Sequence, residues 1–509
     1  MKVLVYSNVI SSEIHIAIAI EIIENHLKKK DTVYFLSFES DNIGCYVHNL
    51  KNCKYCLKQK NYIIESLFKN KIQLVDLRLT NKKFNHPNFK NTNQLLEYKY
   101  DEMPIGELVM STVTDHSRQI VNDIEKVKNF TNTLLNNGIE LYLKTKKFIN
   151  ENEIKKVYVW NGRRSTEGPV IYAAKKNNIE FNTYITGGDP KSYMLQPTLT
   201  THDLEYNKKR AEKFYNDYYL NEKKKLFYID LAKSFFDYMR YGGKKVFGYP
   251  YYKDLFDDKV KIDTRKNNKK ILTIFTSSYY EFFALGKDFR VKNNQDINHY
   301  KNILEILNSK KIVDNFDVRV RWHPNLSTAG EDELKDINKI IYETKNNIIH
   351  YSQNNKINSY KLLEQSDLVL SFGSTIGIEA TYYGKPSILW GVAYYEDSGG
   401  VYDISSLNEL ENLLTKNLKS KPYETSLKFA FHEKMRGEFL YKHVYFDKNL
   451  RYYFKGKQVY KLNFYEKIIE NFKTILKPFG LIKYGRKVLM IIKIIIGKKA
   501  NKSFTPSEW

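Results

Sequence analysis

The stretch LVLSFGSTIGIEATYYGKPSILWG, residues 368–391, has the pattern of a buried strand, a turn rich in Gly and Ser, a helix and a second strand. Ligands of parallel sheets bind at the carboxyl ends of the strands, where the N–H groups of a helix start favour an anion. The junction therefore predicts a nucleotide, with its phosphate beside Ser374 and Thr375. Glu379, roughly one and a third helical turns after Ser374, is placed to accept the ribose hydroxyls. An N-cap serine and a surface glutamate of an ordinary α/β unit give the same pattern, so this alternative stays open.

The alternation of strand and helix patterns runs through both halves of the chain. EIHIAIAIEIIENHLKKK (13–30) has apolar residues at helical spacing and lies between strand-like runs, which predicts a doubly wound parallel sheet. The pattern starts again after a stretch rich in Tyr, Lys and Gly at 238–254. We therefore predict an α/β fold with two Rossmann-like domains at 1–240 and 269–425, joined by a linker at 241–268. A helical C-terminal region at 426–509 follows, part of which is free to cross back onto the first domain.

The chain of 509 residues carries 82 basic and 58 acidic side chains, a net charge of +24. This excess favours a polyanion or an anionic membrane face as partner, although drift in an AT-rich genome also enriches lysine. No zinc-finger, ribonucleoprotein or continuous basic-helix pattern supports nucleic acid. The sequence has no signal-peptide pattern and no run of 18 apolar residues, so we expect a soluble or peripheral protein. The segment 475–502, with apolar clusters interrupted by lysines, fits a helix in a membrane interface or an ordinary packing helix.

Three cysteines provide no disulfide framework, which favours a reducing compartment. They cluster with a histidine as Cys45, His48, Cys53 and Cys56, a set of soft ligands of the kind that hold zinc tetrahedrally. The spacing between the two halves of this set is short for a structural zinc site. Reduced structural thiols therefore remain the alternative to a metal.

Polar side chains follow two further strand-like runs of the second half. Ser277 and Ser278 follow the run that begins at 270, and Arg321 and His323 follow the run that begins at 316. Pro324 ends that second strand and fixes the chain, so the imidazole is held at the edge of the sheet with a donor N–H for a phosphate. A lone histidine at a strand end is more often structural, so the functional interpretation of His323 depends on the polar residues around it.

The first half offers candidates for a proton acceptor and for an anion site. Deprotonation of a hydroxyl needs a carboxylate or an imidazole, and we place Asp115 and His116 first because a run of small and apolar residues precedes them. Glu13, His15 and Asp189 are further candidates, each of which also fits a solvated or helix-capping role. The residues that end the strand-like run at 156–162, which fit an anionic acceptor or surface salt bridges, are Asn161, Arg163 and Arg164.

Several of these stretches together carry a family resemblance. RWHPN (321–325), SDLVLSFGSTIGIEATYYGKPSI (366–388) and YYEDSGG (394–400) resemble GT-B glycosyltransferases that assemble bacterial capsule and O-antigen polysaccharides. IFTSSYYEFFALG (274–286) and VWNGRRSTEGPVIYAAKKNNI (159–179) are similar to the corresponding segments of such proteins. The S-T-x-G-x-E-A-x3-G-K-P pattern also resembles the nucleotide-binding segment of UDP-sugar 2-epimerases, which share the fold. The His-Pro pair is similar to that of bacterial polysialyltransferases and capsule Kdo transferases, and the resemblance covers residues 150–400 best.

The resemblance implies a role for each matching residue. His323, Ser374 and Thr375 would contact the donor phosphate and Glu379 the ribose. Ser277, Ser278 and Arg321 would flank the nucleotide, and Glu396 and Asp397 would lie near the donor sugar. The acidic motif that supplies the base in polysialyltransferases has no clean counterpart, since DEMPIG (101–106) is an imperfect match. No DxD-type site stands out, so we expect no metal and no cofactor, with the nucleotide-sugar as substrate.

The implied activity is transfer of a sugar from a nucleotide donor to a lipid-linked or polymeric surface glycan at the inner face of the cytoplasmic membrane. The basic tail would hold the protein near anionic lipid, and the His-Pro pair favours CMP-linked over UDP-linked donors. Two alternatives remain: a nucleotide-sugar 2-epimerase of the same fold, and a basic scaffold that binds polysaccharide or membrane without catalysis.

Overall fold

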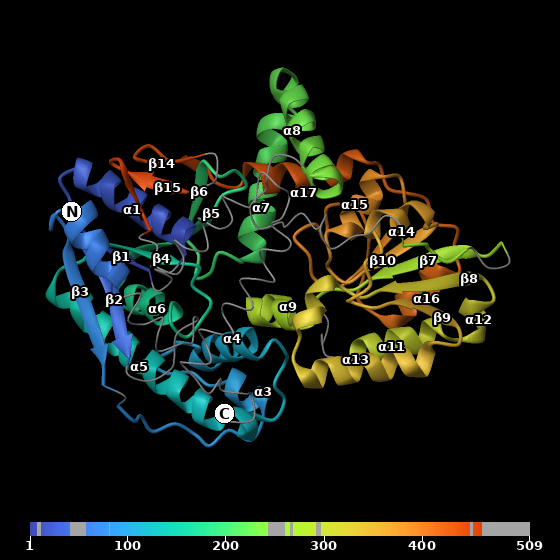
Figure 1. Cartoon of the computed structure of the whole chain (residues 1–509), viewed down its shortest axis with the longest axis horizontal. Coiled ribbons are helices and arrows are strands. Elements are labelled where there is room, and N and C mark those ends of the chain that lie inside the picture. The colour runs from blue at the N-terminus through green and yellow to red at the C-terminus, as the bar shows by residue number, and fades with distance from the viewer. Residues whose placement is uncertain are drawn as a thin grey trace, which may run out of the picture.

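The computed structural model describes residues 1–7, 12–40, 58–80, 82–242, 260–264, 268–291, 297–447 and 451–460. These residues form two lobes, each built on its own mainly or wholly parallel sheet, which lie side by side in Figure 1. The predicted α/β fold with two Rossmann-like domains is thereby confirmed.

The first lobe is a seven-stranded sheet in the order β13-β6-β5-β4-β1-β2-β3. Its strands β1 to β5 run parallel, whereas β6 pairs antiparallel with β5. Because side chains alternate along a strand, Val3 and Val5 of β1 pack toward α1 while Leu4 and Tyr6 pack toward α5 on the other face. The bounds are β1 Lys2–Tyr6, α1 Glu13–Lys28, β2 Thr32–Ser40, η1 Tyr62–Leu67, β3 Gln73–Leu79, α3 Thr92–Leu96, α4 Ile105–Ser117, η2 Ile124–Val127, α5 Lys128–Glu151, β4 Lys156–Trp160, α6 Gly168–Lys176, β5 Glu180–Thr186 and β6 Ser192–Gln196.

The second lobe is a six-stranded, wholly parallel sheet in the order β12-β11-β10-β7-β8-β9. The stretch 368–391 forms β10, a turn, α15 and β11, as its pattern predicts. The bounds are β7 Lys270–Phe275, α9 Tyr279–Leu285, α10 Lys287–Val291, α11 Ile297–Leu307, α12 Lys310–Val313, β8 Phe316–Arg321, η5 Pro324–Thr328, α13 Glu331–Thr344, β9 Ile348–Tyr351, α14 Ser359–Gln365, β10 Leu368–Ser371, α15 Ile376–Tyr382, β11 Ser387–Trp390, β12 Tyr402–Ile404 and α16 Leu407–Leu414.

Two helices from the first half of the chain pack against the second lobe. After α7 (Leu204–Phe214) and η3 (Tyr215–Tyr219), α8 (Glu222–Tyr241) lies along α17 (Glu424–Met435) and projects from the molecule in Figure 1. Phe235 and Phe236 of α8 share one core cluster with Ile378 and Leu389 of the second lobe. Helices within the predicted 1–240 segment therefore belong, by packing, to the second lobe.

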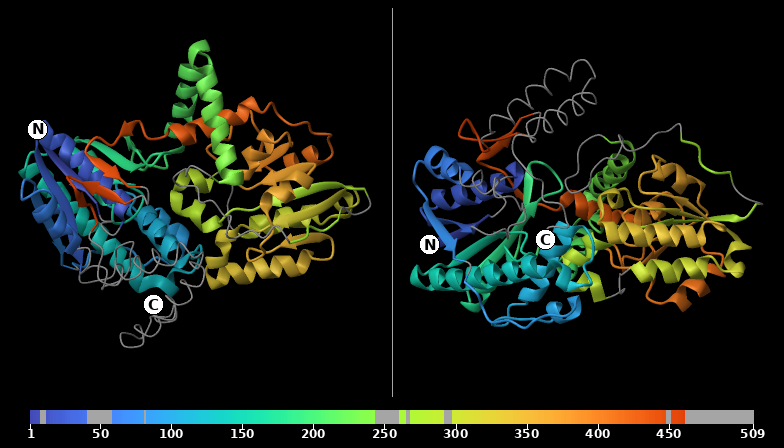
Figure 2. Two further views of the ribbon diagram at one scale, coloured as in Figure 1. Left: turned by 45° about the horizontal axis from the view of Figure 1, so that its top comes forward. Right: turned by 60° about the horizontal axis from the view of Figure 1, so that its bottom comes forward.

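The chain after α17 returns to the first lobe. Figure 2 shows this segment running back beside α1, where β13 (Phe439–Leu440) pairs with β6 and a small sheet forms from β14 (Val444–Phe446), β15 (Tyr452–Phe454) and β16 (Lys457–Gln458). The buried carboxylate of Glu21 on α1 accepts hydrogen bonds from the backbone N–H groups of residues 442–444. Residues 439–458 thus contain strands where the sequence predicted helix: β13 pairs with β6, the N–H groups of residues 442–444 bond to Glu21 of α1, and β14, β15 and β16 pair with one another.

Some predictions fall outside the described residues: the Cys45, His48, Cys53 and Cys56 cluster, the 475–502 segment, and residues 243–259 of the linker. Within the described residues, no helix combines the length and apolar character needed to cross a membrane.

Candidate functional site

The two lobes meet where α4 of the first lobe packs against α9 of the second (Figure 1). The Ser111 hydroxyl donates to the carbonyl of Ala284 at 2.7 Å, and the backbone N–H of Gly330 donates to the carbonyl of Arg118 at 2.9 Å. Arg290 and Glu107 form an ion pair at 3.3 Å across the same contact. The loops at the carboxyl ends of β4, β7 and β8 reach this junction, which is where ligands of such sheets bind.

His323 and Ser278 come together at the ends of the neighbouring strands β8 and β7. The Ser278 hydroxyl lies 3.3 Å from His323 Nδ1, and the backbone N–H of Asn325 donates to the same nitrogen at 3.2 Å. A backbone N–H can only donate, so Nδ1 is the acceptor and the neutral ring carries its proton on Nε2. Burial, with Arg321 nearby, lowers the pKa of His323 to about 4. The imidazole is therefore a neutral Nε2–H donor near pH 7.

Glu281 lies beside this pair and was missed in the sequence, although it stands in the stretch IFTSSYYEFFALG. Its carboxylate accepts from the Asn325 side chain at 3.2 Å, and the residue remains accessible to solvent. Partial burial raises its pKa above the ordinary value, an effect that Asn325 and Ser278 oppose and Asp115 reinforces. Only its spacing of three residues after Ser278, one helical turn, signals this position in the sequence.

Asp115 faces the junction from α4 but is held by two arginines. Its Oδ2 lies 2.8 Å from Arg163 and 2.7 Å from Arg164. Burial would raise its pKa, but the two guanidinium groups outweigh this and hold it below the ordinary value. Arg163 also donates to Ser111 and to the carbonyl of Ala284, so it bridges the two lobes. Asn161, at the end of β4, is buried with a left-handed φ of 60°.

The turn after β10 is built as the sequence predicts, and Glu379 on the helix that follows is hydrogen-bonded within the lobe. Gly373 has a φ of 80°, and a Cβ there would lie 2.6 Å from the carbonyl oxygen of Val392. The Tyr395 hydroxyl donates to the carbonyl of Ser374 at 2.5 Å. Glu379 is buried and accepts from the Thr375 hydroxyl at 2.9 Å and from the Tyr360 hydroxyl. Its carboxylate therefore already has two partners within the lobe, and a ribose contact remains a prediction.

Other predicted site residues have hydrogen-bond or ion-pair partners outside the Ser278–His323 pair. The Arg321 guanidinium donates to the carbonyls of Ser352 and Asn355 in the loop after β9, and burial lowers its pKa to about 10. The backbone N–H of Ser277 donates to the Tyr300 hydroxyl at 3.1 Å, and Glu396 and Asp397 form ion pairs with Lys208 of α7. His116 packs edge-on to Phe130 and lines a pocket between the lobes whose lining does not include Asp115.

Residues 188–439 match the protein family described as capsule polysaccharide biosynthesis protein. The resemblance to proteins of bacterial capsule assembly is thereby confirmed for this part of the chain. A search of curated proteins finds no match.

Several solved structures are similar to the chain. They include the Thermosulfurimonas dismutans KpsC beta Kdo 2,4 transferase, at 13% identity over 62% of this chain and 86% of that chain with a TM-score of 0.35. The beta Kdo 2,7 transferase of the same KpsC has 13% identity over 62% and 85%, with a TM-score of 0.32. Acinetobacter baumannii MurG has 9% identity over 86% and 95%, with a TM-score of 0.26. At such TM-scores these likenesses carry no argument about activity.

Proposed function

Because residues 188–439 match the capsule polysaccharide biosynthesis family, we propose that this protein is a glycosyltransferase. It moves a sugar from a nucleotide donor to a capsule or O-antigen glycan, lipid-linked or polymeric, at the cytoplasmic face of the membrane. The observation that supports this within the structure is a neutral imidazole and a carboxyl of raised pKa that both accept a hydrogen bond from Asn325 at the lobe junction.

In the proposed reaction the two groups have different tasks. His323 Nε2–H donates to a phosphate oxygen of the leaving nucleotide, where negative charge grows in the transition state. Glu281, in its ionised form, accepts the proton of the attacking acceptor hydroxyl. A raised pKa suits a general base, since proton transfer is most efficient when the pKa lies near the working pH. Ser278 holds the imidazole, and the Ser374 turn adds backbone and hydroxyl donors to the phosphate.

Asp115 is the competing candidate for the base. Two guanidinium groups share its oxygen, so its affinity for a proton is low. We assign it instead to fixing Arg163, which joins α4 to α9. The comparison of Glu281→Gln with Asp115→Asn separates these roles, because loss of the base lowers kcat while loss of a lobe contact also lowers thermal stability.

A thermal-shift screen with CMP, UDP, GDP and CDP tests the nucleotide site. We expect one nucleotide to raise the Tm and His323→Ala to weaken its binding about 10-fold or more, as for loss of one hydrogen bond to a charged partner. His86→Ala is the matched control, because His86 is also followed by proline but lies on the surface of the first lobe. Incubation of the donor without acceptor distinguishes a transferase from an epimerase, which would release an epimerised sugar. No shift with any of the four nucleotides would refute the proposal.

A further inference from the structure

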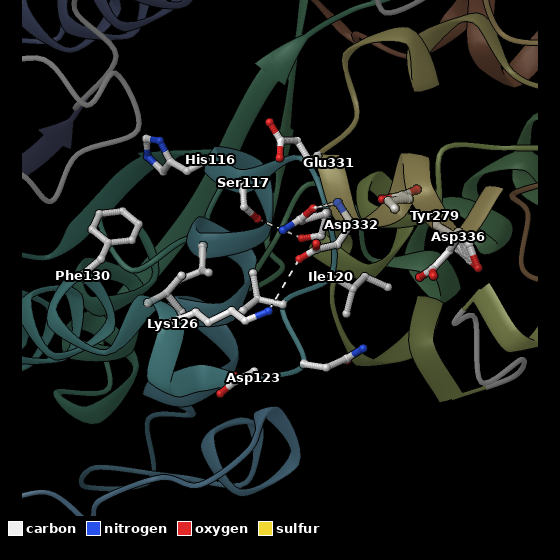
Figure 3. A pocket seen from close by; sticks show the side chains of 17 residues that line it. His116, Ser117, Ile120, Asp123, Lys126, Phe130, Tyr279, Glu331, Asp332 and Asp336 are labelled. Atoms are coloured by element: carbon white, nitrogen blue, oxygen red, sulfur yellow. Dashed lines mark hydrogen bonds and ion pairs between the residues drawn. The ribbon is translucent and has the colours of Figure 1, made fainter. Parts of the chain in front are cut away.

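A cavity whose lining does not include Ser278 or His323 lies between the lobes. It has a volume of about 500 Å³, within the range of small-ligand pockets, and Figure 3 shows it from close by. The first lobe contributes the end of α4 and the chain from 119 to 130, and the second contributes Tyr279 and the first turns of α13. The backbone N–H of Asp332 donates to Gln119 Oε1 at 3.2 Å, which joins the two walls.

The two walls of this cavity differ in chemistry. Val113, Val127 and Phe130 make the first-lobe wall largely apolar. The opposite side carries carboxylates at the start of α13, and Figure 3 shows Asp332 and Asp336 there beside Tyr279. Glu331, Asp332, Glu333 and Asp336 line the cavity from the second lobe. The first lobe adds one acid, Asp123, and one lysine, Lys126, which lies 3.9 Å from Asp332.

Glu333 is the observation that points to a ligand. Its side chain is only 8% exposed, and within the described residues neither of its carboxylate oxygens has a hydrogen-bond partner. A buried polar group without a partner costs about 1–3 kcal/mol, which a bound donor would recover. Burial, with Glu281 and Asp336 nearby, raises the pKa of Glu333 to about 8. Near pH 7 the carboxyl of Glu333 is therefore mostly protonated, and both of its oxygens are available to a hydroxyl or amino group of a ligand.

The chemistry of the lining limits what can bind. The excess of carboxylates repels phosphate and carboxylate groups, so the cavity does not suit the nucleotide donor. The described residues contain no cluster of His, Cys, Asp or Glu suited to a metal ion, and the volume exceeds that of one ion. A saccharide matches both walls, because its C–H faces pack on apolar and aromatic side chains while its hydroxyl or amino groups donate to carboxylates.

We propose that this cavity binds a neutral or amino-bearing sugar unit of the acceptor glycan. The inference rests on the proposed transferase function and adds the acceptor subsite to it. The position of the cavity fits an acceptor subsite, because Asp115 of α4 contacts Arg163 at the lobe junction, whereas the next two residues, His116 and Ser117, line the cavity. On the other lobe, Tyr279 lines the cavity while Ser278, the preceding residue, contacts His323. A glycan bound in the cavity would thus have its terminal hydroxyl near the side chains that we propose for the transfer reaction.

Saturation-transfer NMR with three monosaccharides tests this subsite. N-acetylglucosamine and glucosamine should give signals, whereas glucuronic acid should give none because its carboxylate meets the acidic wall. Ile120→Trp, which fills the cavity, should abolish the signals, and Glu333→Gln should weaken binding at least several-fold. Glu343→Gln is the matched control, since it makes the same substitution at an exposed position on the same helix.

Three results would overturn the inference: equal signals from glucuronic acid, signals unchanged by both cavity variants, or no signal from any of the three sugars. The nucleotide-induced rise in Tm, measured on the same samples, shows that each variant is folded. If that rise is present and sugar binding fails, only the acceptor subsite is wrong. If the rise is absent in the unmodified protein, the proposed function fails as well.

Discussion

The Glu21 carboxylate holds residues 442–444 against the first lobe through hydrogen bonds, and Glu21→Gln should weaken this attachment. The side chain is fully buried; Oε1 accepts from the N–H of Lys442, and Oε2 accepts from those of His443 and Val444, all at 2.9 Å. Glutamine keeps one acceptor oxygen but sets an NH₂ group against at least one N–H and removes the charge. Hydrogen bonds to charged groups contribute about 1.5–3 kcal/mol each, so losing one and weakening the others should cost about 2–4 kcal/mol.

Hydrogen exchange read by mass spectrometry measures this cost locally. The amides of residues 442–444 should exchange about 30- to 1,000-fold faster in Glu21→Gln, the equivalent of about 2–4 kcal/mol. Glu24→Gln is the control, because the contact of Glu24 with this segment, among the residues that the structure describes, is an ion pair with the half-exposed Lys455. This substitution should change exchange by less than about 1 kcal/mol. Equal effects of the two substitutions, or unchanged exchange in Glu21→Gln, would refute the role of the buried carboxylate.

Three further predictions follow from single residues. If Glu281 is the base, kcat/KM should rise with pH and level off above its raised pKa, and Glu281→Gln should lose this rising limb; the same limb in the variant would exclude the assignment. Because Glu333 keeps its proton in the folded state up to about pH 8 but loses it near 4.5 in the unfolded chain, stability should fall as pH rises through that window. Tm measured from pH 5 to 9 should fall less in Glu333→Gln, and an identical slope would contradict the pKa of about 8. Gly330→Ala would place a Cβ 2.1 Å from Gln119 Oε1, so it should lower the Tm, and the added substitution Gln119→Ala should restore part of the loss if the clash is the cause.

The sequence is informative about the sheets because their signals are local. Strand-like runs and the apolar spacing of residues 13–30 correspond to β1, α1 and β2, and the stretch 368–391 corresponds to β10, α15 and β11. The segment after 436 was harder to predict because its strands are only two or three residues long and its position depends on partners far away in the chain. β13 pairs with β6, and Glu21 accepts N–H groups more than 400 residues later.

The site shows the same division between local and distant causes. The register of a parallel sheet places Ser278 and His323 at one edge, so their proximity could be inferred from two strand ends. The hydrogen-bond partner of Glu379 could not be inferred in this way, because the Tyr360 hydroxyl that donates to its carboxylate lies on another helix. Glu333 reads in the sequence as an acid in the first turn of a helix, which the helix dipole alone explains. The contact with the first lobe changes the environment of Glu333. Arg118 and Gln119 accept hydrogen bonds from the start of α13, so that Glu333 lines a cavity between the lobes, where its hydrogen-bond partner would have to come from a ligand. The residues most informative about the acceptor are therefore those whose environment is created by the contact between the lobes.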